Sequence, residues 1–323
     1  MTNRRSFVLG CLAGPLAARA AAAEWRPQRP VTIVVPYPAG GGVDAMARHL
    51  ARDLAAVFGG SFVVENAAGA SGSVGSRRVA RAEPDGHTLL VTTNQTHATN
   101  ISLLKDGGGY DPVRDFTVIG GVADLQHLLV VRRDLQASTV ADLVRLAGAG
   151  QKLTCASTGP GSASHLTMEL FRAKTGVDFV HVPYRGAAPL LQDLVGGRID
   201  LAFTTVPTVL GQIQAGQLRA LAVASPAPSP QVPEAPVLAS AGVAGVEADA
   251  WIAVFAPAGL PAEIVARYAE AIASIMTSPE TKATVAQQGM LPNWRPPDAF
   301  AAFQKQDIER WAAIIRAANV SPE

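Results

Sequence analysis

The chain has 323 residues, of which 48% are hydrophobic and 16% charged. This composition is too apolar for a disordered protein, and the length suits about two domains of ordinary size. The formal net charge is +1, but Arg4, Arg5 and Arg19 lie in a segment expected to be removed, which leaves 24 basic residues against 26 acidic ones and a net charge of −2. That balance provides no positive field for nucleic acid or for an anionic membrane surface, so we expect no nucleic-acid partner.

Residues 1–23 have the organisation of an export signal. Arg4 and Arg5 form a basic start, residues 7–18 are apolar, and residues 21–23 are three alanines suited to signal peptidase. The arginine pair also resembles a twin-arginine signal, and the apolar stretch is too short to span a bilayer as a stable helix. The sequence therefore predicts a periplasmic protein that is cleaved near Ala23.

From residue 24 onward, strand and helix patterns alternate. An apolar strand at 31–35 runs through two prolines into Ala39 and the triplet Gly40, Gly41 and Gly42, and a helix follows as far as Gly59. Three glycines permit positive φ and leave amide N–H groups uncovered, and the helix points its positive end at the same loop. This pattern predicts an anion-binding corner, although a strand-to-helix turn without a ligand has the same appearance.

The next two strands also end in loops that suit a ligand. The strand at 62–64 leads into a loop of small residues at 65–75 and a short helix, and the strand at 88–92 ends in a polar run from Thr93 to His97. Strands separated by helices imply a parallel sheet, in which ligands bind beyond the carboxyl ends of the strands. The sequence therefore predicts a site where these three loops meet.

A second α/β unit repeats this arrangement. It has predicted strands at 128–131, 153–156, 179–182, 199–203 and 218–224, with helices at 138–146, after 165, after 189 and at 208–215. The loop at 157–165 is again rich in glycine and serine, and the loop at 183–189 joins a strand to a helix. The remainder is predicted as a strand at 251–256 followed by helices at 262–276, 279–288 and 297–318.

Signatures of catalysis and metal binding are weak. The six histidines never take a metal-ligand spacing, and there is no C-x-x-C, G-x-S-x-G or Walker sequence. His49 and His127 are interpreted as helix-surface and strand-end residues, and Cys155, the one cysteine after the leader, as a small core residue that cannot form an internal disulfide. We expect no catalytic residue, no metal and no cofactor.

One enzymatic alternative stays open. Residues 40–45 fit the pattern G-x-G-x-x-A after a strand, and Glu65 ends the second strand where a ribose-binding acid would lie. An exported dinucleotide-binding oxidoreductase is therefore a rival interpretation. Pro36 and Pro38, which stiffen the strand end, and the repetition of glycine-rich loops in the second unit favour a receptor that grips an anion from two walls.

Six motifs in order along residues 24–320 together resemble one family. They are PYPAGGGVDAMAR at 36–48, VEN at 64–66, AEPDGHTLL at 82–90, YDPVRDF at 110–116, HVPYRGAAP at 181–189 and FAPAG at 255–259. The combination resembles the Bug family, also called TctC-type, the periplasmic solute receptors of tripartite tricarboxylate transporters.

The resemblance implies a two-domain periplasmic binding protein of type II, the Venus flytrap fold, with a mostly parallel sheet flanked by helices in each domain. Residues 24–122 and 225–323 would form the first domain and residues 123–224 the second, with hinges near 122–124 and 223–225. It also implies a monomer without enzymatic activity, which captures a small carboxylated solute and delivers it to the membrane subunits of a transporter.

The resemblance further implies the residues of the ligand site. The first two loops would supply Tyr37, Ala39, Gly40, Gly41, Asp44, Gly69, Ala70 and Ser71, and the third strand end Thr93, Asn94 and His97. The opposite wall would supply Ser157, Thr158, Gly159, Ser162, His165, Tyr184, Arg185, Gly186, Thr204 and Thr205. Family members that bind amino-acid-like or dicarboxylic solutes often carry an aspartate near the position of Thr204. The uncharged side chain here argues against an amino-acid ligand.

Overall fold

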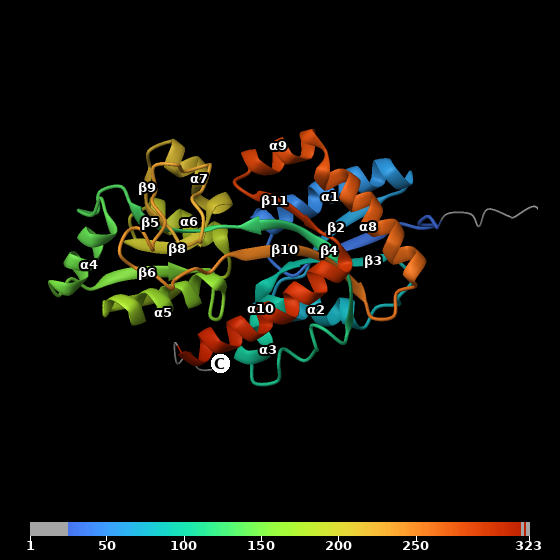
Figure 1. Ribbon diagram of the computed structural model, residues 1–323, viewed down its shortest axis with the longest axis horizontal. Helices are drawn as coiled ribbons and strands as arrows, with labels where there is room; N and C mark the ends of the chain where they lie inside the picture. Colours follow the sequence, from blue (N-terminus) through green and yellow to red (C-terminus); the bar gives the residue numbers. More distant parts are fainter. Residues whose placement is uncertain (1–24, 318–319, 321–323) are drawn as a thin grey trace, which may run out of the picture.

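The computed structural model describes residues 25–317 and residue 320 of the chain. Two α/β domains lie side by side, each built on one sheet with helices packed against it (Figure 1). The larger sheet has the strand order β11-β4-β10-β3-β1-β2 and the smaller one the order β7-β6-β8-β5-β9. The two-domain α/β fold expected from the sequence is confirmed, and the predicted leader at 1–23 lies outside the described residues.

The six-stranded sheet of the first domain is mixed. Its strands are β1 (Val31–Val35), β2 (Phe62–Asn66), β3 (Thr88–Thr93), β4 (Phe116–Leu125), β10 (Ala250–Pro257) and β11 (Leu291–Arg295). Strand β1 pairs in parallel with β2 and β3, whereas β10 pairs antiparallel with β3 and β4, and β11 antiparallel with β4. The sheet is less parallel than the sequence predicts because β4 leads out to the second domain and its neighbour β10 leads back.

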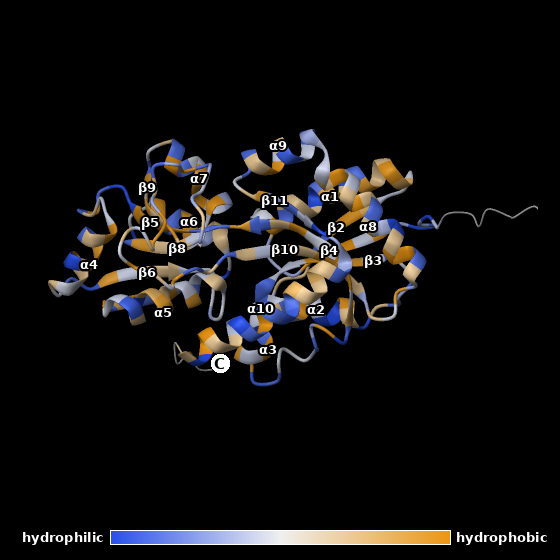
Figure 2. Ribbon diagram, in the orientation of Figure 1, coloured by the Kyte–Doolittle hydropathy of each residue, from blue (hydrophilic) through white to orange (hydrophobic). Residues whose placement is uncertain are grey.

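Helices cover both faces of this sheet. They are α1 (Gly42–Phe58), the 3-10 turn η1 (Ala70–Gly72), α2 (Ser73–Ala80), the π-turn η2 (Gln95–Thr99), α3 (Asn100–Leu103), α8 (Ala262–Thr277), α9 (Pro279–Gln287) and α10 (Pro297–Ala317). Hydrophobic and hydrophilic residues alternate in patches along these helices (Figure 2), as expected of helices that bury one face. In the core, Asp307 of α10 accepts hydrogen bonds from the indoles of Trp251 at 2.7 Å and Trp311 at 3.1 Å.

The second domain contains every strand and helix that the sequence predicts for it. Its strands are β5 (His127–Arg132), β6 (Leu153–Ser157), β7 (Phe179–Pro183), β8 (Leu201–Thr205) and β9 (Leu218–Val223), and its helices are α4 (Val140–Gly148), α5 (Ala163–Thr175), α6 (Ala187–Val195) and α7 (Val206–Gln214). Strand β6 pairs in parallel with β7 and β8, and β5 pairs antiparallel with β8 and β9. This sheet is also mixed, because β5 enters from the first domain against the direction of its neighbours.

Two strands of the first domain were missed in the sequence. Strand β4 contains Gly120 and Gly121, which weaken a strand pattern, but both are required for close packing. A Cβ on Gly120 would lie 2.5 Å from the Trp294 side chain, and one on Gly121 would lie 2.5 Å from Phe300. Strand β11 contains Pro292, and it lies at the edge of the sheet, where a missing N–H is tolerated.

The chain returns to the first domain later than the sequence suggests. Val232 and Ala235 pack in the core beside α6 and α7, and Leu238, Val243 and Val246 pack with Leu129 and Phe171 on the other face of the smaller sheet. Residues 226–247 therefore belong with the second domain. The outward crossing lies at 125–127, close to the predicted hinge, whereas the return crossing lies at 248–250 and not at 223–225.

Two single-residue interpretations have different outcomes. Cys155 is buried in the second core, as expected, and burial raises the pKa of its thiol. His49 is not a surface residue, because α9 covers it and its Nε2 lies 3.1 Å from the Thr281 hydroxyl. Within residues 25–317, no helix has the length and apolarity needed to cross a membrane, and no group of three or more His, Cys, Asp or Glu side chains could hold a metal ion.

Candidate functional site

A cleft between the two domains lies beyond the carboxyl ends of β1, β3, β6 and β8. It encloses about 910 Å³, counting the space at its open mouth. The walls approach each other closely, since a Cβ on Gly42 would lie 3.4 Å from Pro207 and one on Gly186 would lie 3.5 Å from Pro38. The domains therefore stand close together around this space.

Twelve of the residues expected at the site line this cleft. The first domain contributes Tyr37, Ala39, Gly41, Asp44, Thr93 and Asn94. The second domain contributes Thr158, Ser162, Arg185, Gly186, Thr204 and Thr205. The structure thus brings together loops that are separated by more than 100 residues in the sequence.

Asp44 organises the glycine loop in front of α1. Its carboxylate accepts hydrogen bonds from the Gly40 N–H at 3.0 Å, from two Arg48 nitrogens at 3.0 Å and from Asn66 Nδ2 at 2.9 Å. Burial alone would raise the pKa of Asp44, but these hydrogen bonds, with Arg48 foremost, lower it below its usual value. Gly40 does not line the cleft, and its N–H is donated to this carboxylate.

The N-terminus of α1 remains available to a ligand. No side chain in the described residues caps this helix, whose N-cap is Gly41. The N–H groups of Gly41, Gly42 and Val43 therefore stand at the cleft wall without the partners that a helix interior would provide. Together with the helix dipole, they form a site that favours negative charge.

Three further helices begin at the opposite wall. The N-caps of α5, α6 and α7 are Ser162, Gly186 and Thr205, and all three line the cleft. The Ser162 hydroxyl caps α5 by accepting from the His165 N–H, whereas no described side chain caps α6 or α7. Four positive helix ends converge on one space.

The charged side chains of the cleft reinforce this preference. Arg185 is the one lysine or arginine among the described lining residues, and it forms no ion pair or hydrogen bond with any residue that the structure describes. Asp44 is the one lining carboxylate of the described chain, and Arg48 neutralises it. The electrostatic balance of the cleft therefore favours an anion.

Tyr37 ties the first loop to the end of β3. Its hydroxyl lies 2.7 Å from the Thr93 hydroxyl and 3.3 Å from the Thr92 hydroxyl. Burial raises the pKa of Tyr37, so the phenol stays protonated and can donate. The contact holds the loop at 37–41 beside the polar residues that follow β3.

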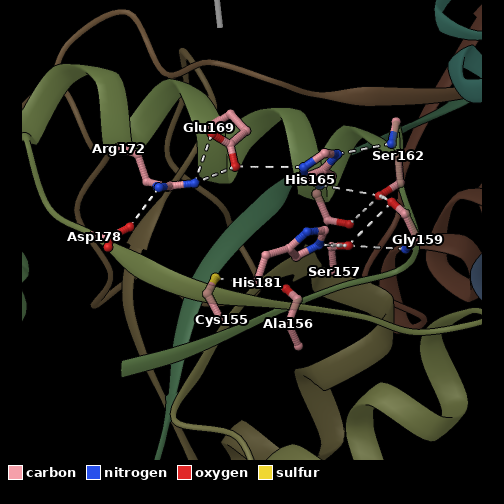
Figure 3. A network of polar contacts seen from close by, with 12 residues as sticks. Cys155, Ala156, Ser157, Gly159, Ser162, His165, Glu169, Arg172, Asp178 and His181 are labelled. Atoms are coloured by element: carbon pink, nitrogen blue, oxygen red, sulfur yellow. Dashed lines mark hydrogen bonds and ion pairs between the residues drawn. The ribbon is translucent and has the colours of Figure 1, made fainter. Parts of the chain in front are cut away.

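A histidine pair supports the loop at 157–165 from behind (Figure 3). The rings of His165 and His181 stack with centroids 4.3 Å apart, and His181 Nε2 lies 2.7 Å from the Ser157 hydroxyl. The Gly161 N–H donates to His165 Nδ1 at 3.1 Å, and the Ser162 hydroxyl donates to the Gly159 carbonyl at 2.6 Å. Ser157, Gly159 and His165 therefore do not line the cleft but position Thr158 and Ser162, which do.

Other residues expected at the site also lie away from the cleft. Gly69, Ala70 and Ser71 have positive φ values of 134°, 45° and 52°, and their loop turns toward α3, where Asn100 Nδ2 donates to the Ser71 carbonyl at 2.9 Å. His97 is buried against the rings of Phe116 and Phe255, and burial lowers its pKa to about 3. Gly69 and Ala70 are exposed, Ser71 is half-buried and His97 is buried in the core, so none of the four lines the cleft.

Tyr184 is also engaged within the protein. Its hydroxyl donates to Asp193 Oδ2 at 2.7 Å. Burial and this carboxylate raise the pKa of Tyr184 to about 12. The tyrosine thereby secures the loop that carries Arg185 and Gly186.

Several cleft residues were missed in the sequence. They include Gln95, Leu125, His127, Thr208 and Ala250. Burial lowers the pKa of His127 to about 4, so its imidazole is neutral near pH 7. Thr208 could have been predicted, because it lies three residues after Thr205, about one helical turn, at the start of α7. Its hydroxyl is 3.0 Å from that of Thr205.

Glu65, the acid that a dinucleotide site would use to bind the ribose, is held in an ion pair. Glu65 pairs with Arg78 through two contacts, one of them 2.7 Å long between Nη2 and Oε2. Glu65 is exposed and does not line the interdomain cleft. The geometry of the second strand end thus weighs against the oxidoreductase alternative.

Comparisons with known proteins agree with the architecture. Residues 46–320 match the family described as the tripartite tricarboxylate transporter family receptor. A UPF0065 protein from the tcbD-tcbE intergenic region of Pseudomonas sp. strain P51 is 38% identical over 90% of this chain and 86% of its own length. Protein BugT of Bordetella pertussis is 34% identical over 91% of this chain and 90% of its own length.

Solved structures give the same result. R. palustris Rpa4515 with adipate is 36% identical, with a TM-score of 0.89 over 92% of this chain and 99% of that one. MatC (Rpa3494) from Rhodopseudomonas palustris with bound malate is 31% identical, with a TM-score of 0.83 over 90% of this chain and 99% of that one. The resemblance seen in the sequence motifs is confirmed: this chain belongs to the Bug or TctC family of periplasmic solute receptors.

Proposed function

We propose that this protein captures a small carboxylated solute in the interdomain cleft and delivers it to a tripartite tricarboxylate-type membrane transporter. The observation that carries the proposal is the convergence of four helix N-termini and the unpaired Arg185 on a cleft whose one carboxylate is neutralised. A carboxylate there would be held by backbone N–H groups of Gly41, Gly42 and Val43, without a dedicated ion pair.

The role is binding without catalysis. Ligand contacts to both walls would stabilise the arrangement in which the domains stand close together, and the transporter would recognise that state. Related structures support a carboxylate, since one contains adipate and another malate. We further propose that the protein acts as a monomer in the periplasm, after removal of residues 1–23 near Ala23 and export by the twin-arginine or the general route.

A thermal-shift screen tests the proposal. The purified protein is heated with mono-, di- and tricarboxylates, aromatic acids and nicotinamide dinucleotides. At least one carboxylate is expected to raise the melting temperature in a concentration-dependent manner. Stabilisation by a dinucleotide and by no carboxylate would overturn the receptor proposal in favour of a dinucleotide-binding protein, and the absence of any response would leave a structural envelope protein.

A further inference from the structure

We propose that closure of the cleft is coupled to the uptake of a proton by Asp249, so that the receptor holds its solute more tightly in mildly acidic than in neutral solution. The inference rests on the proposed function, because it concerns how binding in the same cleft is regulated. It assigns a role to a carboxylate that does not line the cleft and that lies where the chain returns to the first domain.

Asp249 lies within the return crossing. The N–H of Ala248, the residue before it, donates to the Ala224 carbonyl of the second domain at 3.1 Å. Ala250, the residue after it, pairs with Leu125 in the ladder of β4 and β10 and lines the cleft. A rotation of the domains about the two crossings therefore changes the surroundings of Asp249 directly.

The second domain and the outward crossing hold the carboxylate of Asp249 through neutral groups. Its Oδ2 accepts from the hydroxyl of Ser225, which follows β9, at 2.7 Å. Gln126 Nε2 donates to the same hydroxyl at 3.1 Å. The backbone N–H of His127 also donates to the carboxylate. Burial lowers the pKa of His127 to about 4, so its imidazole adds no charge above pH 5.

Among the described residues, Asp249 forms no ion pair, and its buried Oδ1 has no hydrogen-bond partner. The charged groups that face it are Asp124 of β4 and Arg310 of α10, both in the first domain. Asp124 repels it, and Arg295 pairs with Asp124 at 2.8 Å. The Arg310 guanidinium lies 2.9 Å from the Asp307 carboxylate. A buried carboxylate without its own cation is costly to ionise.

The surroundings of Asp249 favour its protonated form. Burial raises the pKa of Asp249 from 3.8 to about 6; the hydrogen bond from Ser225 opposes this rise, the charge of Asp124 adds to it, and the charge of Arg310 opposes it. Rotation of the domains away from each other would separate Ser225 from Asp124 and admit water to the carboxylate. The pKa of Asp249 would then return toward its ordinary value.

The closed form therefore binds a proton at Asp249 more tightly than the open form. Protonation of Asp249 favours closure fully below a pH of about 4, and this contribution is lost as the pH rises through about 6. Ligand binding requires closure, so the affinity for the solute should increase as the pH falls from neutral toward 5.

Isothermal titration at pH 5.5, 6.5 and 7.5 tests this inference, with adipate, malate and the other carboxylates of the thermal-shift screen as probes. Asp249→Asn keeps the shape of the acid without a charge at any pH. For each carboxylate that binds, the gain in affinity from pH 7.5 to pH 5.5 is expected to be at least threefold larger in the wild-type protein than in Asp249→Asn. Titration of the probe and of the buried histidines occurs in both proteins and cancels in this comparison.

Two further variants locate the effect. Ser225→Ala removes the hydrogen bond that favours the charged acid, so its affinity should already rise between pH 7.5 and pH 6.5. This variant leaves Asp249 in place and tests the coupling even if Asp249→Asn fails to fold. Asp178→Asn is the matched control, because its side chain is 88% exposed in the second domain, and it should keep the pH dependence of the wild-type protein.

The outcomes separate the two proposals. If no carboxylate binds at any of the three pH values, the proposed function itself fails. If carboxylates bind but the wild-type protein and Asp249→Asn gain affinity equally as the pH falls, the receptor stands and the coupling to Asp249 is overturned. The same conclusion follows if Ser225→Ala has the pH dependence of the Asp178→Asn control.

Discussion

The carboxylate of Asp44 accepts the Gly40 N–H at 3.0 Å, four residues before it in the chain. The same carboxylate binds Arg48 and Asn66, so one buried side chain joins the glycine loop, the first helix and the end of β2. Because its charge is compensated there, this acid is compatible with a wall that we propose to bind an anion.

Asp44→Ala is expected to lower the free energy of unfolding by about 1–3 kcal/mol, because it leaves the Gly40 N–H and Asn66 without their acceptor. Carboxylate affinity should fall as well, since the loop loses its anchor. Chemical denaturation and titration calorimetry measure the two effects. Glu263→Ala, which removes an exposed acid from the first turn of α8, is the control and should cost less than about 1 kcal/mol. Equal losses for both variants would contradict an anchoring role.

Gly41→Val is expected to weaken carboxylate binding at least tenfold while the protein stays folded. The backbone of Gly41 is extended, with φ −89° and ψ 171°, and no described atom lies within 4 Å of the position of a Cβ. The added side chain would therefore cover the helix N-terminus without strain. Gly60→Val, also at an open position, is the matched control and should bind normally. Unchanged affinity of Gly41→Val would remove this loop from the site.

Gly161→Ala is expected to weaken binding by preventing close approach of the domains. A Cβ at Gly161 would overlap Cδ2 of Leu103, which belongs to the first domain, and the φ of 69° adds strain. The double variant with Leu103→Ala should recover part of the affinity, because it removes the obstructing atoms. Small-angle scattering with and without ligand measures whether the single variant still contracts. A normal contraction would show that this contact does not limit closure.

His181 makes stability depend on pH. Burial and the neighbouring His165 lower the pKa of His181 from about 6.5 to about 4. The unfolded chain therefore binds the proton more readily, and stability rises with pH between 4 and 6.5 and is lost as pH falls through that range. His181→Gln should reduce the proton uptake on unfolding at pH 5 by close to one proton. Urea denaturation at several pH values measures this, and an unchanged slope would contradict it.

The alternation of strands, helices and glycine-rich loops predicted two α/β units and the loops at the ends of their strands, and the resemblance to the Bug family supplied the residues that form half of the cleft wall. Those features depend on local patterns such as the triplet at Gly40 and the glycine- and serine-rich loop at 157–165. What the sequence did not reveal depends on long-range contacts. His127 reaches the cleft only because β5 enters from the other domain, and Gly40 is unavailable only because Asp44 turns back to it. The return crossing was misplaced because the packing of Leu238 and Val246 on the second core has no local signal.

The two chain crossings have a consequence for how the receptor moves. Leu125 and Ala250 are partners in the antiparallel ladder of β4 and β10, and both line the cleft. Because the two connections are adjacent and hydrogen-bonded to each other, they would restrict the domains to a hinge rotation about one axis and would oppose rotation about other axes. A solute bound as proposed would lie against this axis, because Leu125 and Ala250 line the cleft. Because the ligand would lie close to the axis, a small change in its size would produce a larger displacement at the parts of the two domains farthest from the axis. Those parts are the surfaces that a membrane partner could reach.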